Sequence, residues 1–204
     1  MKHNLKILLL ILTTIISLVP RLDVSASAGY SNYDRYFFYS SGQANNAYTN
    51  FLRWGYVTNY PADTPFTKTN ILSQIPKLDC FYASCHGGQS SMYAGYNGTE
   101  SISASEIDAV SLGFYKFVYL DACWTAYSNA MAAAFNINDG DGQDHAYLGW
   151  TTVIQDSLSY SLFTSVIFQD LDAGDTLIES ALNAQSYTGC SSWIWYGKST
   201  MKVR

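Results

Sequence analysis

Short apolar runs alternate with longer stretches of helical spacing along most of the chain. The runs are rich in aromatic and aliphatic residues and reach strand length without reaching helix length, which is typical of buried strands. The run at 114–120 is the most strand-like in composition. These runs predict strands at residues 36–39, 56–60, 78–84, 114–120, 146–150 and 193–196.

The stretches between the runs carry apolar residues at intervals of three and four, which predicts helices. The first of them ends before Gly55, a residue that commonly follows the last turn of a helix. Ser103 with Glu106 three positions later has the pattern of a helix-capping pair. We expect helices at residues 43–54, 67–75, 103–110, 125–135, 157–171 and 176–185, and a loop rich in Ser, Gly, Tyr and Asn at 89–102.

The first 28 residues have the pattern of a secretory signal peptide. Lys2 and Lys6 precede an apolar run from Ile7 to Val19, and Ala26-Ser27-Ala28 provides a small-residue cleavage site. The run is about 13 residues long, whereas a membrane-spanning helix needs roughly 20. We therefore predict that residues 1–28 are removed and that the protein is secreted, with no stable membrane anchor after cleavage.

Strands that alternate with helices are typical of α/β proteins, in which helices cover both faces of a mostly parallel sheet. The chain that follows the predicted leader has a length that suits one domain, and it contains no internal repeat or linker. We therefore predict a single α/β domain at residues 29–204, with a mostly parallel central sheet flanked by helices on both faces.

The charge balance excludes some partners. The full chain has 16 acidic and 11 basic residues, and loss of the leader would leave 15 acidic and 8 basic residues, a net charge of −7. Such a chain repels the phosphates of nucleic acids and of anionic lipids. We expect neither of them as a partner.

Two of the predicted strands end in residues that can carry chemistry. Cys85-His86-Gly87 follows the run at 78–84, and Asp121-Ala122-Cys123 follows the run at 114–120. The carboxyl ends of parallel strands lie at one edge of the sheet, where α/β proteins bind their ligands. If these two strands are neighbours, His86 and Cys123 emerge side by side. A cysteine nucleophile needs a base within hydrogen-bond reach, so we predict Cys123 as nucleophile and His86 as general base.

Backbone groups next to this pair can hold a developing oxyanion. Gly87 has no side chain, so its N–H group can approach the reacting carbonyl, and the N–H group of Cys123 can be the second donor. The helix predicted from Thr125 would place its N-terminus beside Cys123, where it would favour the thiolate.

The two strand-end segments, Phe81-Tyr82-Ala83-Ser84-Cys85-His86-Gly87 and Phe117-Val118-Tyr119-Leu120-Asp121-Ala122-Cys123, together resemble the paired motifs of the caspase-like cysteine peptidases. This group, clan CD, includes caspases, metacaspases, legumain, clostripain, gingipains and the CHAT domains. The resemblance continues at Tyr147-Leu148-Gly149-Trp150 and at Gly174-Asp175-Thr176. It implies a caspase-like domain and an endopeptidase that acts on proteins or peptides.

The resemblance also implies roles for individual residues. His86 would be the general base, Cys123 the nucleophile, and Gly87 a donor to the oxyanion. In several of these families the residue two positions before the nucleophile lines the primary specificity pocket, so Asp121 implies cleavage after Arg or Lys. Trp150 and Thr151 would form part of the pocket wall. The chain departs from the family pattern at Cys85, where many members have Gly or Ser.

Other interpretations of the same residues stay open. Asp121 could instead cap the helix predicted after it. Cys80 and Cys85-His86 have the order of a c-type haem attachment site, although their spacing is too wide and the residues between them fit a strand. Cys190 could form a disulfide with Cys80 or Cys85. The whole domain could also be a catalytically silent, extracellular binding module of the same fold.

The acidic loop at 138–144 is the one candidate for a metal site. Asp139, Asp141 and Asp144 could hold Ca²⁺, but the order of an EF-hand loop is incomplete and its closing Glu is absent. We favour a solvated turn and expect no metal or other cofactor. His145, which follows this loop, is expected to have a structural role.

Overall fold

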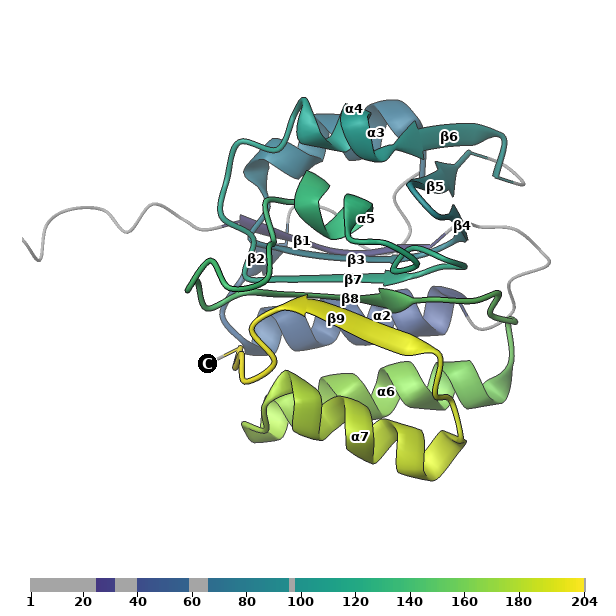
Figure 1. Ribbon diagram of the computed structural model, residues 1–204, viewed down its shortest axis with the longest axis vertical. Helices are drawn as coiled ribbons and strands as arrows, with labels where there is room; N and C mark the ends of the chain where they lie inside the picture. The colour runs from purple at the N-terminus through teal and green to yellow at the C-terminus, as the bar shows by residue number, and fades with distance from the viewer. Residues whose placement is uncertain (1–24, 32–39, 59–65, 96–97, 204) are drawn as a thin grey trace, which may run out of the picture.

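The structure, a computed structural model, describes residues 25–31, 40–58, 66–95 and 98–203. Its centre is a six-stranded sheet with the strand order β2-β1-β3-β7-β8-β9 (Figure 1). Neighbouring strands are parallel except β8 and β9. The predicted mostly parallel sheet is therefore confirmed. Its strands are β1 (Ser25–Ser31), β2 (Val57–Thr58), β3 (Cys80–Ser84), β7 (Phe117–Asp121), β8 (Ala146–Trp150) and β9 (Trp193–Gly197).

Helices cover both faces of this sheet, as predicted (Figure 1). One face carries α2 (Ser40–Arg53), α6 (Leu158–Ala173) and α7 (Leu177–Thr188). The other face carries α3 (Lys68–Gln74), the 3-10 turn η1 (Ile75–Lys77), α4 (Ala104–Asp108) and α5 (Ala130–Ala134). The expected helices at 43–54, 67–75, 103–110, 157–171 and 176–185 correspond to α2, α3, α4, α6 and α7.

The alternation of side chains along the strands divides the core into two clusters. Tyr82 and Tyr119 belong to the cluster beneath α2, α6 and α7, whereas Phe81 and Leu120 belong to the cluster on the opposite face. In the first cluster the ring of Phe168 packs edge-on against Tyr82, with centroids 5.7 Å apart. A fully buried side chain of this size stabilises the fold by about 2–3 kcal/mol.

Helix ends follow the chemistry of their capping residues. The hydroxyl of Ser103 accepts from the backbone N–H of Glu106, and the Glu106 carboxylate accepts from the N–H of Ser103, so both halves of the predicted capping pair are present. Thr176 and Glu179 form the same arrangement at the start of α7. α6 ends at Gly174, whose φ of 97° is readily available to glycine.

The expectation of a loop at 89–102 was wrong. This region contains β5 (Ser91–Ala94) and β6 (Glu100–Ser103). β5 pairs with β4 (His86–Gly88) on one side and with β6 on the other, which gives a three-stranded antiparallel sheet. The small sheet lies on the same side of the central sheet as α3 and α4 (Figure 1). Its strands are short and half polar, and only Met92, Ala94 and Ile102 are buried in the core. Such strands form through pairing between segments, so composition alone does not reveal them.

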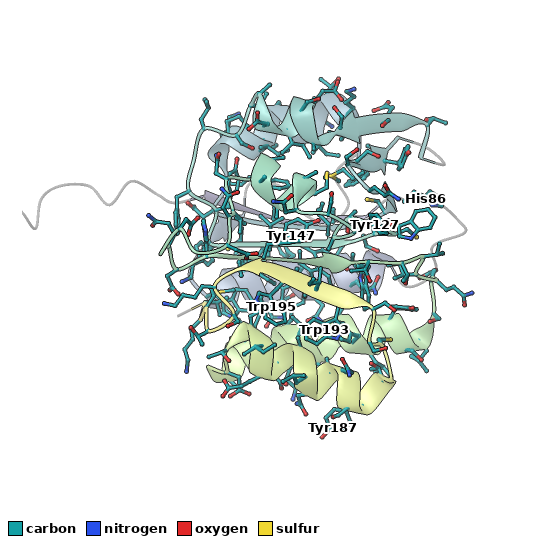
Figure 2. The ribbon with its side chains drawn as sticks, in the orientation of Figure 1. His86, Tyr127, Tyr147, Tyr187, Trp193 and Trp195 are labelled. Atoms are coloured by element: carbon teal, nitrogen blue, oxygen red, sulfur yellow. The ribbon has the colours of Figure 1, made fainter. Side chains whose placement is uncertain are left out.

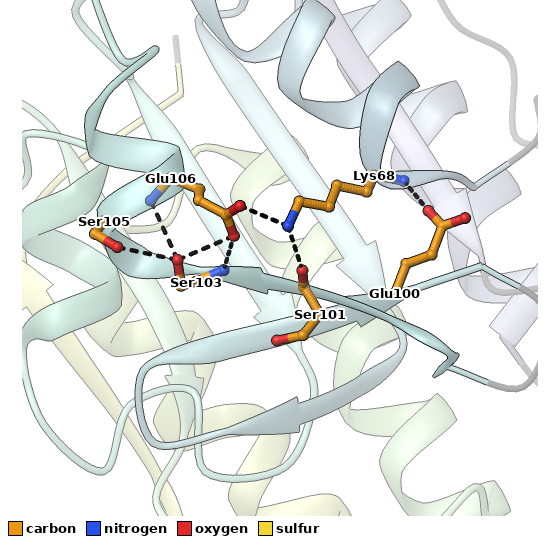
Figure 3. Close-up of polar contacts among 6 residues, drawn as sticks. All are labelled: Lys68, Glu100, Ser101, Ser103, Ser105 and Glu106. Atoms are coloured by element: carbon orange, nitrogen blue, oxygen red, sulfur yellow. Dashed lines mark hydrogen bonds and ion pairs between the residues drawn. The ribbon is translucent and has the colours of Figure 1, made fainter.

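A cluster of polar side chains connects β6, the outer strand of this small sheet, to α3 (Figure 3). The backbone N–H of Lys68 donates to the Glu100 carboxylate at 2.6 Å, and the Lys68 ammonium donates to the carbonyl of Ser101 at 2.9 Å. The same ammonium pairs with Glu106 at 2.5 Å, and its hydrogen bond lowers the pKa of Glu106 to about 2. The strand that begins with His86 is thus held through its neighbours to a helix of the main body.

The N-terminal boundary stays a prediction. Residues 1–24 lie outside the described residues, as does the strand expected at 36–39. β1 begins at Ser25, so cleavage after Ala28 would fall within this strand and remove its pairs with β2, while Tyr30 and Ser31 would stay paired with β3. Across the described ranges, every helix is too short or too polar to cross a bilayer.

Candidate active site

The register of β3 and β7 brings the two candidate segments together. These strands are parallel neighbours, and Ser84 is paired with Asp121 at their carboxyl ends. The backbone N–H of Cys85 also donates to the carbonyl of Asp121, at 3.4 Å. The condition set by the sequence, that the two strands be neighbours, is met. His86 and Cys123 therefore leave the central sheet at the same edge.

Gly87 packs directly against the backbone of residues 122–126, here called the cysteine loop because it carries Cys123. A Cβ atom at this position would lie 2.4 Å from the carbonyl oxygen of Cys123 and 2.9 Å from the Cβ of Ala122. Such contacts are too short for any residue other than glycine. A similar contact occurs at Gly98, where a Cβ atom would lie 2.9 Å from Cδ2 of His86. Two glycines thus let the chain close around His86 and Cys123.

The segment after Cys123 is a series of turns, so the expected helix at 125–135 is wrong in its first half. α5 begins only at Ala130. The hydroxyl of Thr125 donates to the carbonyls of Leu120 and Ala122, at 3.1 and 2.9 Å, and this favours a turn over a helix. The helix that was expected to begin beside Cys123 therefore begins only at Ala130, seven residues after it.

Backbone groups of the segment after β8 surround the Cys123 sulfur instead. The N–H of Ile154 donates to Sγ at 3.3 Å, and the thiol lies 3.5 Å from the carbonyl oxygen of the same residue. The N–H of Trp124 donates to the carbonyl of Thr152 at 3.0 Å, and the N–H of Ala126 donates to that of Trp150 at 2.9 Å. The segment after β8 therefore fixes the cysteine loop along its length.

Trp124 has a backbone conformation that is unusual for its residue type. Its φ is 55°, in the left-handed region. For a residue with a side chain this region costs about 1–2 kcal/mol relative to the right-handed one. The residue is 39% exposed and belongs to neither core cluster. The strain lies immediately after the candidate nucleophile.

A cavity of about 370 Å³ opens at this edge of the sheet. His86 and Cys123 both line it, and the half-buried Cys123 and the exposed His86 face it from neighbouring strand ends. Its walls include two carboxylates and no Lys or Arg side chain among the described residues. The lining residues are Gln43, Ser84, Cys85, His86, Asp121, Cys123, Ile154, Gln155, Asp156 and Tyr160.

Asp121 is a buried carboxylate at the cavity, held by three donors from the core. Its Oδ1 accepts from the Trp150 indole at 2.8 Å, and its Oδ2 accepts from the hydroxyls of Tyr82 at 3.0 Å and Thr164 at 3.1 Å. Burial raises the pKa of Asp121 to about 6, although these hydrogen bonds act in the opposite direction. The helix that follows it in the sequence, α5, begins at Ala130 with Asn129 as its N-cap residue, so the alternative that Asp121 caps this helix is excluded.

Two residues expected in the pocket wall do not line the cavity. Trp150 is fully buried because it alternates in phase with Ala146 and Leu148, which face the α6 side of the core. It reaches the site only through Asp121. The hydroxyl of Thr151 donates to the carbonyl of Ser192. Sequence reasoning missed the actual wall, which is residues 154–156 and Tyr160, because this irregular segment has no periodic pattern.

The acidic side chains of the loop at 138–144 bind other residues of the fold. Asp141 binds Nε2 of the buried His145 at 2.8 Å, Asp139 accepts from the N–H of Gly197 at 2.7 Å, and Asp144 pairs with Lys116 and Lys198. The expected structural role of His145 is thereby explained. In the described ranges, no group of three His, Cys, Asp or Glu side chains is arranged to hold a metal ion.

All four cysteines are free thiols, so the disulfides considered for Cys190 are not present. Cys80 and Cys85 lie in different core clusters, on opposite faces of the sheet, which does not suit attachment to one haem. Burial raises the pKa of Cys85 to about 12. Cys123 is the only one of the four that is not buried.

Comparison with solved structures identifies the fold of this chain. It has a caspase-like α/β fold, as gingipain R has. The chain superposes on the Arg-specific cysteine proteinase gingipain R (RgpB) with a TM-score of 0.56 and 14% identity, over 88% of this chain and 46% of that one. A complex of Porphyromonas gingivalis RgpB pro- and mature domains gives 0.57 and 15% identity, over 89% and 47%.

The chain therefore spans about half the length of these gingipain structures. A pro-caspase-1 structure is less similar, with a TM-score of 0.43 and 12% identity over 81% of this chain and 78% of that one. No family model matches the sequence. No curated protein matches it either.

Proposed function

We propose that this protein is a secreted cysteine endopeptidase that uses Cys123 and His86. The observation that carries the proposal is that both side chains line one cavity at the carboxyl ends of two paired parallel strands. In the reaction, His86 takes the proton of the Cys123 thiol as Sγ attacks the scissile carbonyl carbon. The resulting imidazolium then protonates the leaving amine, and water hydrolyses the thioester by the reverse sequence of steps.

The backbone N–H groups of Gly87 and Cys123 hold the oxyanion of the tetrahedral intermediates. The close approach of Gly87 to the Cys123 backbone supports this role, because it brings the main-chain segments that carry the two N–H groups within contact distance of each other. Donors of this kind lower the barrier by about 3–4 kcal/mol each when they are fixed before the reaction.

The primary specificity is for Arg or Lys before the scissile bond. Asp121 supports this proposal because it brings a carboxylate to a cavity whose size suits one long side chain. Asp156 adds a second carboxylate to the same cavity. The three donors that hold Asp121 keep its position fixed, so a cationic group meets a charge that needs no rearrangement. Trp150 contributes by orienting this carboxylate.

The test combines active-site labelling with a panel of peptides that differ in the residue before the scissile bond. We expect turnover of Arg and Lys peptides, and alkylation of Cys123 by an arginyl chloromethyl ketone. Cys123→Ala should abolish both, and His86→Ala should lower turnover by roughly 10²–10⁴-fold. Cys190→Ala, at a buried cysteine outside the cavity, is the matched control and should keep wild-type turnover.

The contrary result is equally specific. If the folded protein cleaves none of these peptides and Cys123 is not labelled faster than the buried cysteines, the chain is not a peptidase. The catalytically silent binding module would then be the better interpretation, and a peptide should still bind at the cavity.

A further inference from the structure

We propose that Trp124 and Tyr127, here called the aromatic rim, bind the first residue after the scissile bond and favour an apolar or aromatic side chain there. The inference rests on the proposed peptidase function and adds a second specificity to it. Both residues belong to the turn segment that begins at Cys123, and the N–H of Tyr127 donates to the carbonyl of Trp124 at 3.0 Å. Their side chains are 39% and 59% exposed.

Neither the backbone nor the core accounts for a tryptophan at position 124. Its φ of 55° would suit Gly or Asn, and Asn136 is the one other non-glycine residue with positive φ in the described part of the chain. Trp124 is partly exposed and belongs to neither core cluster. A bulky side chain kept in a strained conformation beside a reacting group indicates a contact outside the fold.

The rim lies on the leaving-group side of the site. Neither aromatic residue lines the cavity that takes the side chain before the scissile bond. The leaving nitrogen receives its proton from His86, so the residue attached to that nitrogen must lie on the His86 side. Tyr127 and His86 lie at the same end of the central sheet (Figure 2). The hydroxyl of Ser128, next to Tyr127, donates to the carbonyl of Gln89 just after β4, at 3.5 Å.

The chemistry of the rim selects its occupant. Two aromatic rings offer a large apolar area with few degrees of freedom to lose on binding. The N–H of Trp124 donates to the carbonyl of Thr152, and the next residue, Val153, is a further exposed apolar residue, at 54%. Phe, Leu or Met after the scissile bond would cover this surface, whereas Gly would leave it in water.

The test compares two peptides that are identical except for Phe or Gly directly after a scissile Arg. We expect wild type to cleave the Phe peptide about 10-fold faster by kcat/KM, the range typical of one apolar contact. Trp124→Gly and Tyr127→Ala should each reduce this ratio to about 2-fold. Leu182→Ala, at an exposed apolar residue of α7, is the control that should keep the wild-type ratio. The ratio is independent of how much of each preparation is folded.

Thermal unfolding separates binding from a structural role. Trp124→Gly should melt close to the wild-type temperature, because relief of the strain at positive φ offsets the loss of the partly buried ring. Equal cleavage of the two peptides by wild type, or an unchanged ratio in both rim variants, would overturn the rim while the peptidase assignment stands. Absence of any cleavage would overturn the peptidase assignment and the rim with it.

Discussion

The two faces of the central sheet supply different halves of the candidate site. On the face of α2, α6 and α7, Asp121 ends a buried network with Tyr82, Trp150 and Thr164, and this network brings a carboxylate to the cavity. On the opposite face, apolar residues lie beneath a small antiparallel sheet whose first residue, His86, is exposed.

This difference reflects two physical requirements. A fixed charge for recognition must be held by donors, and it can be buried only because those donors offset its lost hydration. A group that transfers protons must reach both solvent and substrate, so it belongs on an exposed segment. The sheet separates the two requirements by face and joins them at one edge.

The largest effect is expected on stability, on the face of α2, α6 and α7, here called the Asp121 face. Phe168→Ala should lower the free energy of unfolding by about 3–5 kcal/mol, because Phe168 is fully buried among aromatic rings. Urea denaturation would measure the change. Phe135→Ala, which removes a fully buried ring on the other face, is the matched variant. A loss below 1 kcal/mol at Phe168 would mean that this cluster collapses around the gap.

The next largest effect is expected on the face that carries His86, where Gly87 contacts the cysteine loop. Gly87→Ala should lower kcat by about 10²–10³-fold, because the added methyl group must push the Cys123 carbonyl and the oxyanion donors apart. Gly88→Ala is the control, since its methyl group would meet the movable hydroxyl of Ser91. Equal turnover of the two variants would argue against an oxyanion site at Gly87.

The pH dependence of cleavage tests whether the charge of the Asp121 carboxylate recognises the substrate. Because the pKa of Asp121 is raised to about 6, protonation below that pH removes the negative charge that attracts an Arg side chain. The ratio of kcat/KM for an Arg peptide to that for its citrulline analogue should fall toward one as pH decreases through 6. A ratio that stays constant from pH 7 to 5 would contradict recognition by Asp121.

The same group affects stability with the opposite sign. Its pKa rises above the ordinary value of 3.8 when the chain folds, because the carboxyl group is buried, so the folded state binds the proton more tightly. The contribution of Asp121 to stability is therefore greatest below about pH 4 and is lost as pH rises through 6. Acid should suppress cleavage after Arg without unfolding this part of the core.

The smallest effect is expected when one of the three hydrogen-bond donors to Asp121 is removed. Tyr82→Phe deletes a hydrogen bond that lowers the pKa of Asp121, so the acid limb of the Arg-to-citrulline ratio should move to higher pH. The free energy of unfolding should fall by about 1 kcal/mol. Tyr147→Phe, which removes a hydroxyl bonded to Thr125 on the other face, should leave the acid limb unchanged.

The sequence predicted the strands and helices that have a strong internal pattern. β3, β7, β8 and the long helices α2, α6 and α7 were recognisable from their periodicity. β4, β5 and β6 were not, because each is three or four residues long and stabilised by its neighbours. The start of α5 was misplaced because the hydroxyl of Thr125 binds two carbonyls that precede it, which holds this segment in a turn.

The candidate site divides in the same way. His86, Gly87, Asp121 and Cys123 are strand-end residues, and the expected order of strands was enough to bring them together. The burial of Trp150 follows from its alternation with Leu148, a signal that the sequence did contain. The cavity wall at 154–156 depends on how an irregular segment folds back over the Cys123 sulfur, and only the structure reveals that path.

The contact at Gly87 has a consequence for how the sequence can vary. A side chain of any kind at this position would meet the carbonyl of Cys123, so a library of random variants selected for a folded, active protein should contain glycine alone there. Gly113 has open space around its Cβ position and should tolerate most residue types. Two glycines of one chain would thus mark the extremes of mutational tolerance, according to what lies opposite each of them.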